Sequence, residues 1–290
     1  MITPEISSLQ LRDITEISEM LAVERLQKEI WGIEDREIFP ALALVPMIEV
    51  GGVLIGAFDE KGLAGFVFGF AGLENGKASL HSDMLAVRPE YRRHGLGYQL
   101  KLAQRERALE KGIDTITWTF DPLQARNARL NFGKLGVIAD SYRINYYGET
   151  TSFLHQSGTD RLWVTWKLNS ERVRDRVAGP RSDISRNDDV VNVVCVSEND
   201  EPLVFSIEEF VERNTGGTPV ARDFAIEIPG DINRITERDA TLTLRWREAT
   251  RAAFTKLIDG GYRVSEFHFI DGPAGRVGRY LLTVRTTISD

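Results

Sequence analysis

A basic loop that contains two glycines is the feature of this sequence most able to do chemistry. It carries the motif Arg92-x-x-Gly95-x-Gly97, with Arg93 and His94 inside the motif, and it lies between a β-rich segment and a helical pattern. Glycine lets backbone N–H groups approach an anion without a Cβ in the way. The N-terminus of a helix directs further N–H donors and a positive dipole end to the same place. We therefore predict that this loop binds a diphosphate.

Two other phosphate-binding loops do not fit these residues. A Walker loop requires the pattern GxxxxGK[ST], which the sequence lacks, and a Rossmann fingerprint would have a third glycine where the chain has Leu100. A protein that binds a nicotinamide or flavin dinucleotide is therefore the weaker alternative. The same residues would equally suit a helix start that only faces solvent. The secondary-structure elements around the loop are therefore needed to distinguish the two roles.

Hydrophobic patterning predicts that strands and helices alternate around the loop. Before it, three β-rich segments are joined by short turns that contain glycine, which is typical of an antiparallel meander. After it, helical and β-rich patterns alternate, and Gly112 and Gly136 are expected to end the two helices. The expected strands are 10–12, 52–58, 63–70, 78–87, 113–120 and 161–168; the expected helices are 13–31, 96–111 and 124–135; and a loop is expected from Phe39 to the strand at 52.

These elements and motifs resemble the GNAT superfamily of acyl-coenzyme A acyltransferases. The matching residues are the strand Ser82–Val87, the Arg92-x-x-Gly95-x-Gly97 loop and the later run Asn127-Ala128…Phe132-x-Lys134-Leu135-Gly136-Val137. The resemblance covers about residues 9–168. It implies an α/β fold whose mixed, mostly antiparallel central sheet is flanked by helices.

The resemblance also implies an acyl-CoA co-substrate, for example acetyl-CoA, and the residues that bind it. The loop would hold the diphosphate, and the strand before it would pair its backbone with the pantetheine arm. Asn127 and Asn131 would bond the pantetheine amides, and Lys134 would reach a coenzyme phosphate. The full set of expected coenzyme-binding residues is Leu85, Ala86, Val87, Arg92, Arg93, His94, Gly95, Leu96, Gly97, Tyr98, Asn127, Asn131 and Lys134.

Acylation of an amine needs a base, because a free lysine-like amine has a pKa near ~10. Strict alternation along a strand would put His81, Asp83, Leu85 and Val87 on one face. A histidine beside a carboxylate can take the proton directly or through water. We therefore expect His81 and Asp83 to be catalytic, with a purely structural hydrogen-bonded pair as the alternative.

A general acid is harder to find in this sequence. The family commonly uses a tyrosine where this chain has Phe132, which cannot donate a proton. Tyr142 is the expected replacement, and Tyr146 and Tyr147 are further candidates. Packing is the competing role for each tyrosine, and a thiolate is also able to leave without an acid.

Composition excludes several other classes of protein. The 43 acidic residues exceed the 36 Lys and Arg residues, for a net charge of −7, which disfavours nucleic acid as a partner. Cys195 is the single cysteine and the four histidines are scattered, so we expect no internal disulfide and no metal site. The N-terminus lacks the pattern of a secretory signal, and no apolar run is suited to spanning a membrane. We therefore expect a cytoplasmic protein without a membrane partner.

The chain is expected to contain two domains. An acyltransferase domain would occupy residues 1–170, a linker dense in charge residues 171–189, and a small α/β domain of unknown role residues 190–290. In that last part, β-rich segments are expected at 190–196, 202–207, 263–270 and 280–285, with a helix over 242–257.

We expect an enzyme that moves an acetyl or other short acyl group from acyl-CoA to a primary amine of a small molecule, by direct attack in a ternary complex. A protein-directed acyltransferase and a non-enzymatic acyl-CoA sensor are the alternatives. A homodimer is among the expectations because members of the superfamily often dimerise.

Overall fold

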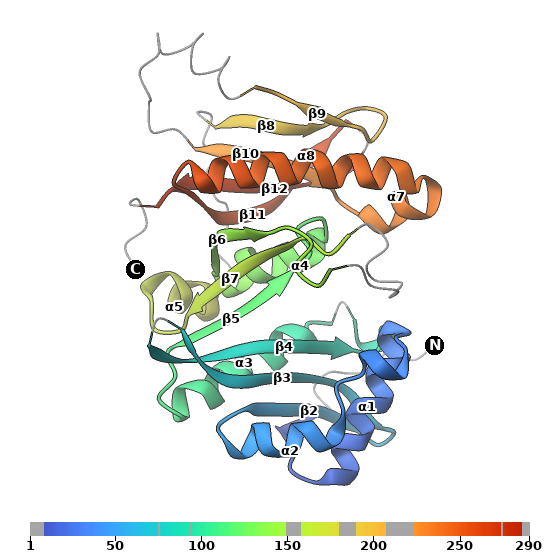
Figure 1. Cartoon of the computed structure of the whole chain (residues 1–290), viewed down its shortest axis with the longest axis vertical. Coiled ribbons are helices and arrows are strands. Elements are labelled where there is room, and N and C mark those ends of the chain that lie inside the picture. The colour runs from blue at the N-terminus through green and yellow to red at the C-terminus, as the bar shows by residue number, and fades with distance from the viewer. Residues whose placement is uncertain are drawn as a thin grey trace. The chain divides into compact units, whose positions relative to one another are not determined.

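The computed structural model shown in Figure 1 describes residues 9–74, 76–92, 94–148, 158–179, 190–206, 223–273 and 275–285. Its contacts divide the chain into two compact units. The first unit contains Met1–Trp118, Thr151–Gln156 and Lys167–Asn169, and the second contains Thr119–Thr150, Ser157–Trp166 and Ser170–Asp290. The expected α/β class, with a mixed and mostly antiparallel sheet, is confirmed.

Strands of the first unit follow the order β1-β2-β3-β4-β5. The first four are antiparallel, and the turns between β2, β3 and β4 are the short glycine-bearing ones that the sequence predicts. β5 lies parallel to β4. The bounds are β1 (Gln10–Asp13), β2 (Val53–Asp59), β3 (Gly62–Glu74), β4 (Lys77–Val87) and β5 (Thr115–Phe120).

Two helices cover one face of this sheet, and a third helix covers the other. α1 (Ile17–Trp31) and α2 (Ala41–Glu49) pack on a core that includes Phe66, Phe68 and Met84. α3 (Leu96–Glu110) lies on the opposite face and contacts β2, β3 and β4. Single 3-10 turns occur at Asp35–Glu37 and Pro89–Tyr91.

The helix α2 replaces part of the loop that the sequence predicts from Phe39. Two prolines suggested a loop, but Pro40 precedes the helix at its N-cap, where the missing N–H costs nothing. Pro46 lies inside the helix, yet Ala41 and Leu44 are buried. Burial of that apolar face therefore outweighs the local penalty of the internal proline.

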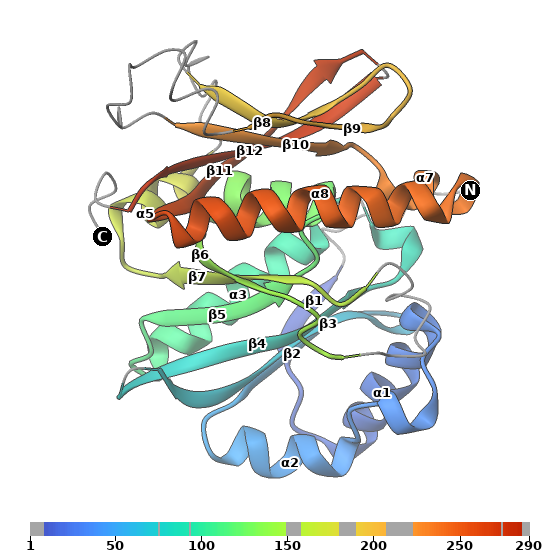
Figure 2. The ribbon, with the colours of Figure 1, turned by 45° about the horizontal axis from the view of Figure 1, so that its top comes forward.

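The second unit carries the strands β7-β6-β11-β12-β10-β8-β9 in that order. Every pairing with a described register is antiparallel except that of β10 with β8. Figure 2 shows the long helix α8 lying along these strands. The strands are β6 (Ile138–Arg143), β7 (Arg161–Lys167), β8 (Val191–Val196), β9 (Pro202–Val204), β10 (Phe224–Pro229), β11 (Tyr262–Gly272) and β12 (Gly275–Val284); the helices are α4 (Ala125–Ala128), a π-helix over Arg129–Leu135, α5 (Glu171–Ala178), α7 (Ile232–Arg238) and α8 (Ala240–Asp259).

Part of the predicted linker is a helix. Residues 171–178 form α5, whose N-cap Ser170 accepts a hydrogen bond from the backbone N–H of Val173. Val173 is buried, and the basic side chains of α5 pair with groups distant in sequence, which a local charge count does not reveal. Residues 180–189 lie outside the described part of the chain. The division into domains at 170 and 190 stays a prediction.

Candidate active site

A β-bulge interrupts β4 at Asp83. Phe68 on β3 pairs with Met84, and the next residue, Gly69, pairs with Ser82, so Asp83 is the extra residue of the bulge. An extra residue reverses the alternation of side chains on either side of it. The four residues that strict alternation would place on one face of β4 are therefore divided between two faces.

The side chains near the bulge show this division. An ideal Cβ on Gly97 would lie 3.7 Å from Leu85 Cδ2 and 4.0 Å from Val87 Cγ2, so Leu85 and Val87 face α3. His81 instead lies against Phe70, with 5.3 Å between ring centroids, on the face that α1 and α2 cover. The expectation that His81 shares a face with Leu85 and Val87 is wrong, because the bulge shifts the phase of the strand.

β4 and β5 are paired over a short stretch only. Among the described residues, their register joins Leu80 to Ile116 and His81 to Thr117, and it contains no pair beyond His81. The backbone of β4 from Ser82 to Val87 pairs with β3 on its other edge. An extended molecule that carries amide groups is able to add to such an edge in the manner of a further strand.

The glycine motif forms a tight turn at the start of α3. Gly95 has φ +90°, in the left-handed region, and the helix begins at Leu96. A Cβ added at Gly97 would meet the Leu85 and Val87 side chains at ordinary van der Waals distance. The loop therefore brings a helix N-terminus to the end of β4, as the sequence predicts for an anion site.

Two side chains hold this loop to the sheet. The Arg92 Nε donates to the Val87 backbone oxygen at 3.0 Å. The hydroxyl of buried Tyr91 donates to Asp59 at the end of β2, and this hydrogen bond raises the pKa of Tyr91 to about 12. His94 is exposed, and Arg93 lies outside the described residues.

His81 lies at the last position of β4 that pairs with β5, and it is half-buried. Its Nδ1 is 3.1 Å from Thr117 Oγ1. Burial, with a smaller contribution from the charge of Lys101, lowers the pKa of His81 below its ordinary 6.5. Desolvation raises the pKa of Asp83, although part of its side chain reaches solvent. A histidine that is neutral at pH 7 is able to accept a proton.

A buried polar cluster under the bulge was not predicted from the sequence. Lys101 Nζ donates to Ser82 Oγ and to Gln104 Oε1, each at 2.8 Å, and it lies 3.8 Å from the centroid of the Trp118 ring. Burial lowers the pKa of Lys101 well below its usual range. Lys101 and Gln104 fall on the buried stripe of α3, beside Leu100, and that helical spacing could have revealed them.

The second unit holds the other predicted residues. Asn127 on α4 and Lys134 on the π-helix are exposed, whereas Asn131 is buried within the π-helix. The Asn131 backbone oxygen accepts from the N–H groups of Gly136 and Val137, which close the helix. π-Helical turns occur frequently at functional sites.

Phe132, at the position where the family commonly has a tyrosine, and Tyr142, the expected replacement acid, are both held by close packing. Phe132 is fully buried, with ring centroids 6.1 Å from Phe120 and 5.8 Å from Tyr280. The Tyr142 hydroxyl donates to Asp160 Oδ2 at 2.8 Å, and burial is the main reason that its pKa is raised far above the usual range. Proton donation by Tyr142 stays a prediction.

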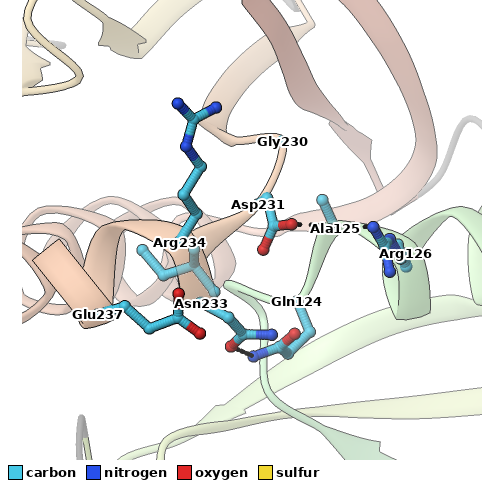
Figure 3. A pocket seen from close by; sticks show the side chains of 9 residues that line it. Gln124, Ala125, Arg126, Gly230, Asp231, Asn233, Arg234 and Glu237 are labelled. Atoms are coloured by element: carbon cyan, nitrogen blue, oxygen red, sulfur yellow. Dashed lines mark hydrogen bonds and ion pairs between the residues drawn. The ribbon is translucent and has the colours of Figure 1, made fainter. Parts of the chain in front are cut away.

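A polar cavity of about 180 Å3 lies within the second unit, between the start of α4 and α7 (Figure 3). Gln124 donates to Asn233 Oδ1 at 3.0 Å there, and Arg126 forms an ion pair of 3.8 Å with Asp231. None of the predicted site residues lines this cavity. In the described part of the chain, no group of His, Cys, Asp and Glu is arranged to hold a metal ion, and no helix has the length and hydropathy of a membrane span.

The chain was compared with protein families, curated proteins and solved structures. Residues 16–136 match the family model described as "Acetyltransferase (GNAT) family". No curated protein matches the chain. Among solved structures, the ribosomal-protein-S18-alanine N-acetyltransferase from Escherichia coli is 16% identical, with 62% of this chain and 97% of that chain covered and a TM-score of 0.44.

Two further solved structures are similar to part of this chain. Arabidopsis thaliana NAA60 in complex with acetyl-CoA is 14% identical, with 56% of this chain and 99% of that chain covered and a TM-score of 0.46. An aminoglycoside acetyltransferase from an uncultured soil metagenomic sample is 18% identical, with 42% and 85% covered and a TM-score of 0.38. Similarities this low leave the acceptor open.

Residues 16–136 are therefore similar in sequence to the acetyltransferase (GNAT) family, in agreement with the resemblance carried by the Arg92-x-x-Gly95-x-Gly97 loop.

Proposed function

We propose that this enzyme transfers an acetyl or other short acyl group from acyl-CoA to the primary amine of a small molecule, by direct attack in a ternary complex. The observation that carries the proposal is the β4 edge beyond His81, whose end at Val87 lies beside the glycine turn that opens α3. A ligand that joins an amide-bearing arm to a diphosphate would fit these two features: the arm would add to the strand edge, and the diphosphate would bind at the turn.

In this proposal, the backbone of Leu85, Ala86 and Val87 pairs with the pantetheine arm. The segment Arg92–Tyr98 holds the diphosphate with backbone N–H groups and basic side chains. Asn127 and Asn131 are assigned to the pantetheine amides, and Lys134 is assigned to a phosphate. Gly97 supports this assignment, because the fold itself leaves room for a methyl group at this position.

The proposed reaction forms one bond and breaks another. The amine nitrogen attacks the thioester carbonyl carbon, and a C–N bond forms while the proton of the amine passes to His81, directly or through water. Backbone N–H groups of β4 stabilise the oxyanion, and one such donor is typically worth ~2.7–4 kcal/mol. The C–S bond then breaks, and coenzyme A leaves as the thiolate.

The roles of the remaining candidates follow from their surroundings. Asp83 is the bulge residue of β4, next to the point where the pairing of β4 with β5 ends. We assign it to binding the acceptor amine or a water that carries the proton to His81. The Tyr142 hydroxyl already donates to Asp160, so the proposal lets the thiolate depart without a tyrosine acid. A cysteine-like thiol has a pKa of about 8.5, which makes its thiolate a tolerable leaving group near neutral pH.

A coenzyme-binding sensor is the second candidate, because fully buried Phe132 offers no proton where the family commonly has a tyrosine. Turnover separates the two functions. Coenzyme A, acetyl-CoA, propionyl-CoA, succinyl-CoA and, as a control, NADH are tested by thermal unfolding, and the acyl-CoA that stabilises the protein is then tested for thiol release with a panel of small amines and a lysine peptide. A ligand at about 100 times its Kd should stabilise the protein by roughly 2.7 kcal/mol.

Stabilisation by a thioester together with amine-dependent thiol release is the expected result. Stabilisation without release against any amine would indicate the sensor, and release with the peptide alone would indicate a protein acceptor. Absence of stabilisation by every coenzyme A species would refute both the transferase and the sensor.

A further inference from the structure

The stretch from Asp121 to Gly136, here called the 121–136 segment, contains Asn127, Asn131 and Lys134. It follows the end of β5 and contains α4 and the π-helix, and all of it belongs to the second unit. Its two ends are held by side chains from later parts of the chain.

The start of the segment is held by an arginine on α8. Arg247 donates from Nη1 to Asp121 Oδ1 at 2.7 Å and from Nη2 to Asp121 Oδ2 at 2.9 Å. Asp121 Oδ1 also accepts from the Leu123 N–H at 3.0 Å, so the same carboxylate shapes the turn into α4. The Arg247 side chain is 2% exposed, and a bidentate pair of this kind fixes orientation as well as charge.

A tyrosine on β12 holds the next residue. The Tyr280 hydroxyl donates to the Pro122 backbone oxygen at 2.6 Å, and the residue is fully buried. The Tyr280 ring also packs edge-on against Phe132, at 5.8 Å between centroids. One side chain therefore contacts both the start of the segment and the middle of its π-helix.

The end of the segment is held through α5 and a carboxylate on β11. Arg176 Nη1 donates to the Gly133 oxygen at 3.1 Å, and Arg172 Nε donates to the Gly136 oxygen at 3.0 Å. Both guanidinium groups form ion pairs with Glu266, at 2.8 Å for Arg172 and 2.6 Å for Arg176. Basic groups stabilise the last carbonyls of a helix, and Glu266 keeps these two in place.

By comparison, the contacts that cross the cavity of Figure 3 are weak. The Arg126–Asp231 pair is 3.8 Å long and largely exposed, and exposed pairs of this kind contribute little. The anchoring of the segment therefore rests on the buried contacts of Arg247, Tyr280 and Glu266.

We propose that the C-terminal region of this chain is a positioning element of the acyltransferase, which fixes the 121–136 segment through Arg247 and Tyr280 at its start and Glu266 at its end. The inference rests on the proposed function in one respect, namely that the segment binds the coenzyme. Amide side chains that bind a flexible arm need a rigid support, because each ångström of misplacement weakens binding. On this view residues 224–285 complete the enzyme and are no separate module.

The test uses the full chain and two mild substitutions. Tyr280→Phe removes only the hydroxyl that holds Pro122, and Glu266→Gln removes the charge that holds the two arginines. The matched control for the first is Tyr262→Phe on β11, since the Tyr262 ring packs on Phe224. Arg247→Met, with the exposed Arg245→Met on the same helix as its control, is added where the variant folds.

Three kinds of measurement are made on each variant. They are the Kd for coenzyme A by titration calorimetry, KM for acetyl-CoA with kcat, and hydrogen exchange of the amides of 124–135 without ligand. We expect Tyr280→Phe and Glu266→Gln to raise Kd and KM at least threefold, to leave kcat within twofold, and to speed exchange in that peptide at least fivefold. Both controls should match the wild type.

Two results would overturn the inference. The first is unchanged exchange over 124–135 in both variants. The second is faster exchange with an unchanged Kd in a wild type that binds coenzyme A, which would mean that the anchors serve stability alone. Failure of the wild type to bind coenzyme A would refute the proposed function instead, and the exchange data would still decide whether the segment is anchored.

Discussion

Gly97 allows the proposed coenzyme loop to be perturbed without disturbing the fold. In Gly97→Ala, the new methyl group would lie 3.7 Å from Leu85 Cδ2 and 4.0 Å from Val87 Cγ2, which are ordinary contacts. Alanine is favoured over glycine in a helix by about 1 kcal/mol. We therefore expect the variant to be as stable as the wild type or to melt about 2–4 °C higher.

Coenzyme binding should respond in the opposite direction. In the proposed complex the diphosphate lies at the first N–H groups of α3, and a methyl group on the second residue of that helix would limit how closely the anion approaches them. We expect the Kd for coenzyme A to rise at least tenfold, which corresponds to ~1.4 kcal/mol. Titration calorimetry measures this Kd, and differential scanning calorimetry measures the melting temperature.

Gly95→Ala is the matched comparison, since no atom lies within 4 Å of its ideal Cβ but its φ is +90°. A left-handed conformation costs a residue with a Cβ roughly 1–2 kcal/mol, so this variant should lose stability. An unchanged Kd in Gly97→Ala would refute the diphosphate assignment of the loop. A marked loss of stability in Gly97→Ala would instead contradict the packing described for Leu85 and Val87.

Three further variants test single residues. His81→Ala should lower kcat at least tenfold and leave the Kd for coenzyme A within twofold. Because burial lowers the pKa of His81, the wild-type kcat/KM should decline on the acid side with an inflection below pH 6.5. Thiol release between pH 5 and pH 9 measures kcat and the pH profile of kcat/KM. Lys101→Met should remove a pH dependence of the free energy of unfolding. Because the pKa of Lys101 is lowered in the folded protein, only the unfolded chain carries the proton on Lys101 between that lowered pKa and 10.5. The stability of the wild type should therefore rise with pH over this range, relative to that of the variant. Urea unfolding at pH 7 and pH 9.5 shows this, and parallel curves would contradict it. Tyr142→Phe should cost about 1.5–3 kcal/mol of stability, as the hydrogen bond to Asp160 is lost, with kcat within threefold; a tenfold fall in kcat of the folded variant would make Tyr142 the acid.

Local signals in the sequence were sufficient for most elements of the first unit. Short glycine-bearing turns predicted the β2–β3–β4 meander, and Gly112 and Gly136 do take positive φ values at the ends of their helices. α2 was missed because its two prolines are typical of a loop, whereas its stability comes from burial of residues such as Leu44. Tertiary packing of this kind leaves little trace in local composition.

The glycine turn at the start of α3 was predictable from the sequence, and the geometry of β4 was less so. The bulge at Asp83 depends on the register with β3, and a strand sequence does not state its register. The sequence therefore predicts the wrong face for His81, although His81 does lie where the pairing of β4 with β5 ends. The polar cluster of Lys101 and the anchors of Arg247 join positions on different elements, which patterns within one element do not report.

The anchoring of the 121–136 segment has a consequence for the order in which the chain folds. Asp121 and Arg247 are 126 residues apart, and Pro122 and Tyr280 are 158 apart. At ~5–20 residues per second, the ribosome makes the arginine about 6–25 s after its aspartate. Burial of Asp121 without that partner would be costly, so this half of the protein stays unfinished during synthesis and assembles only when its last strands emerge.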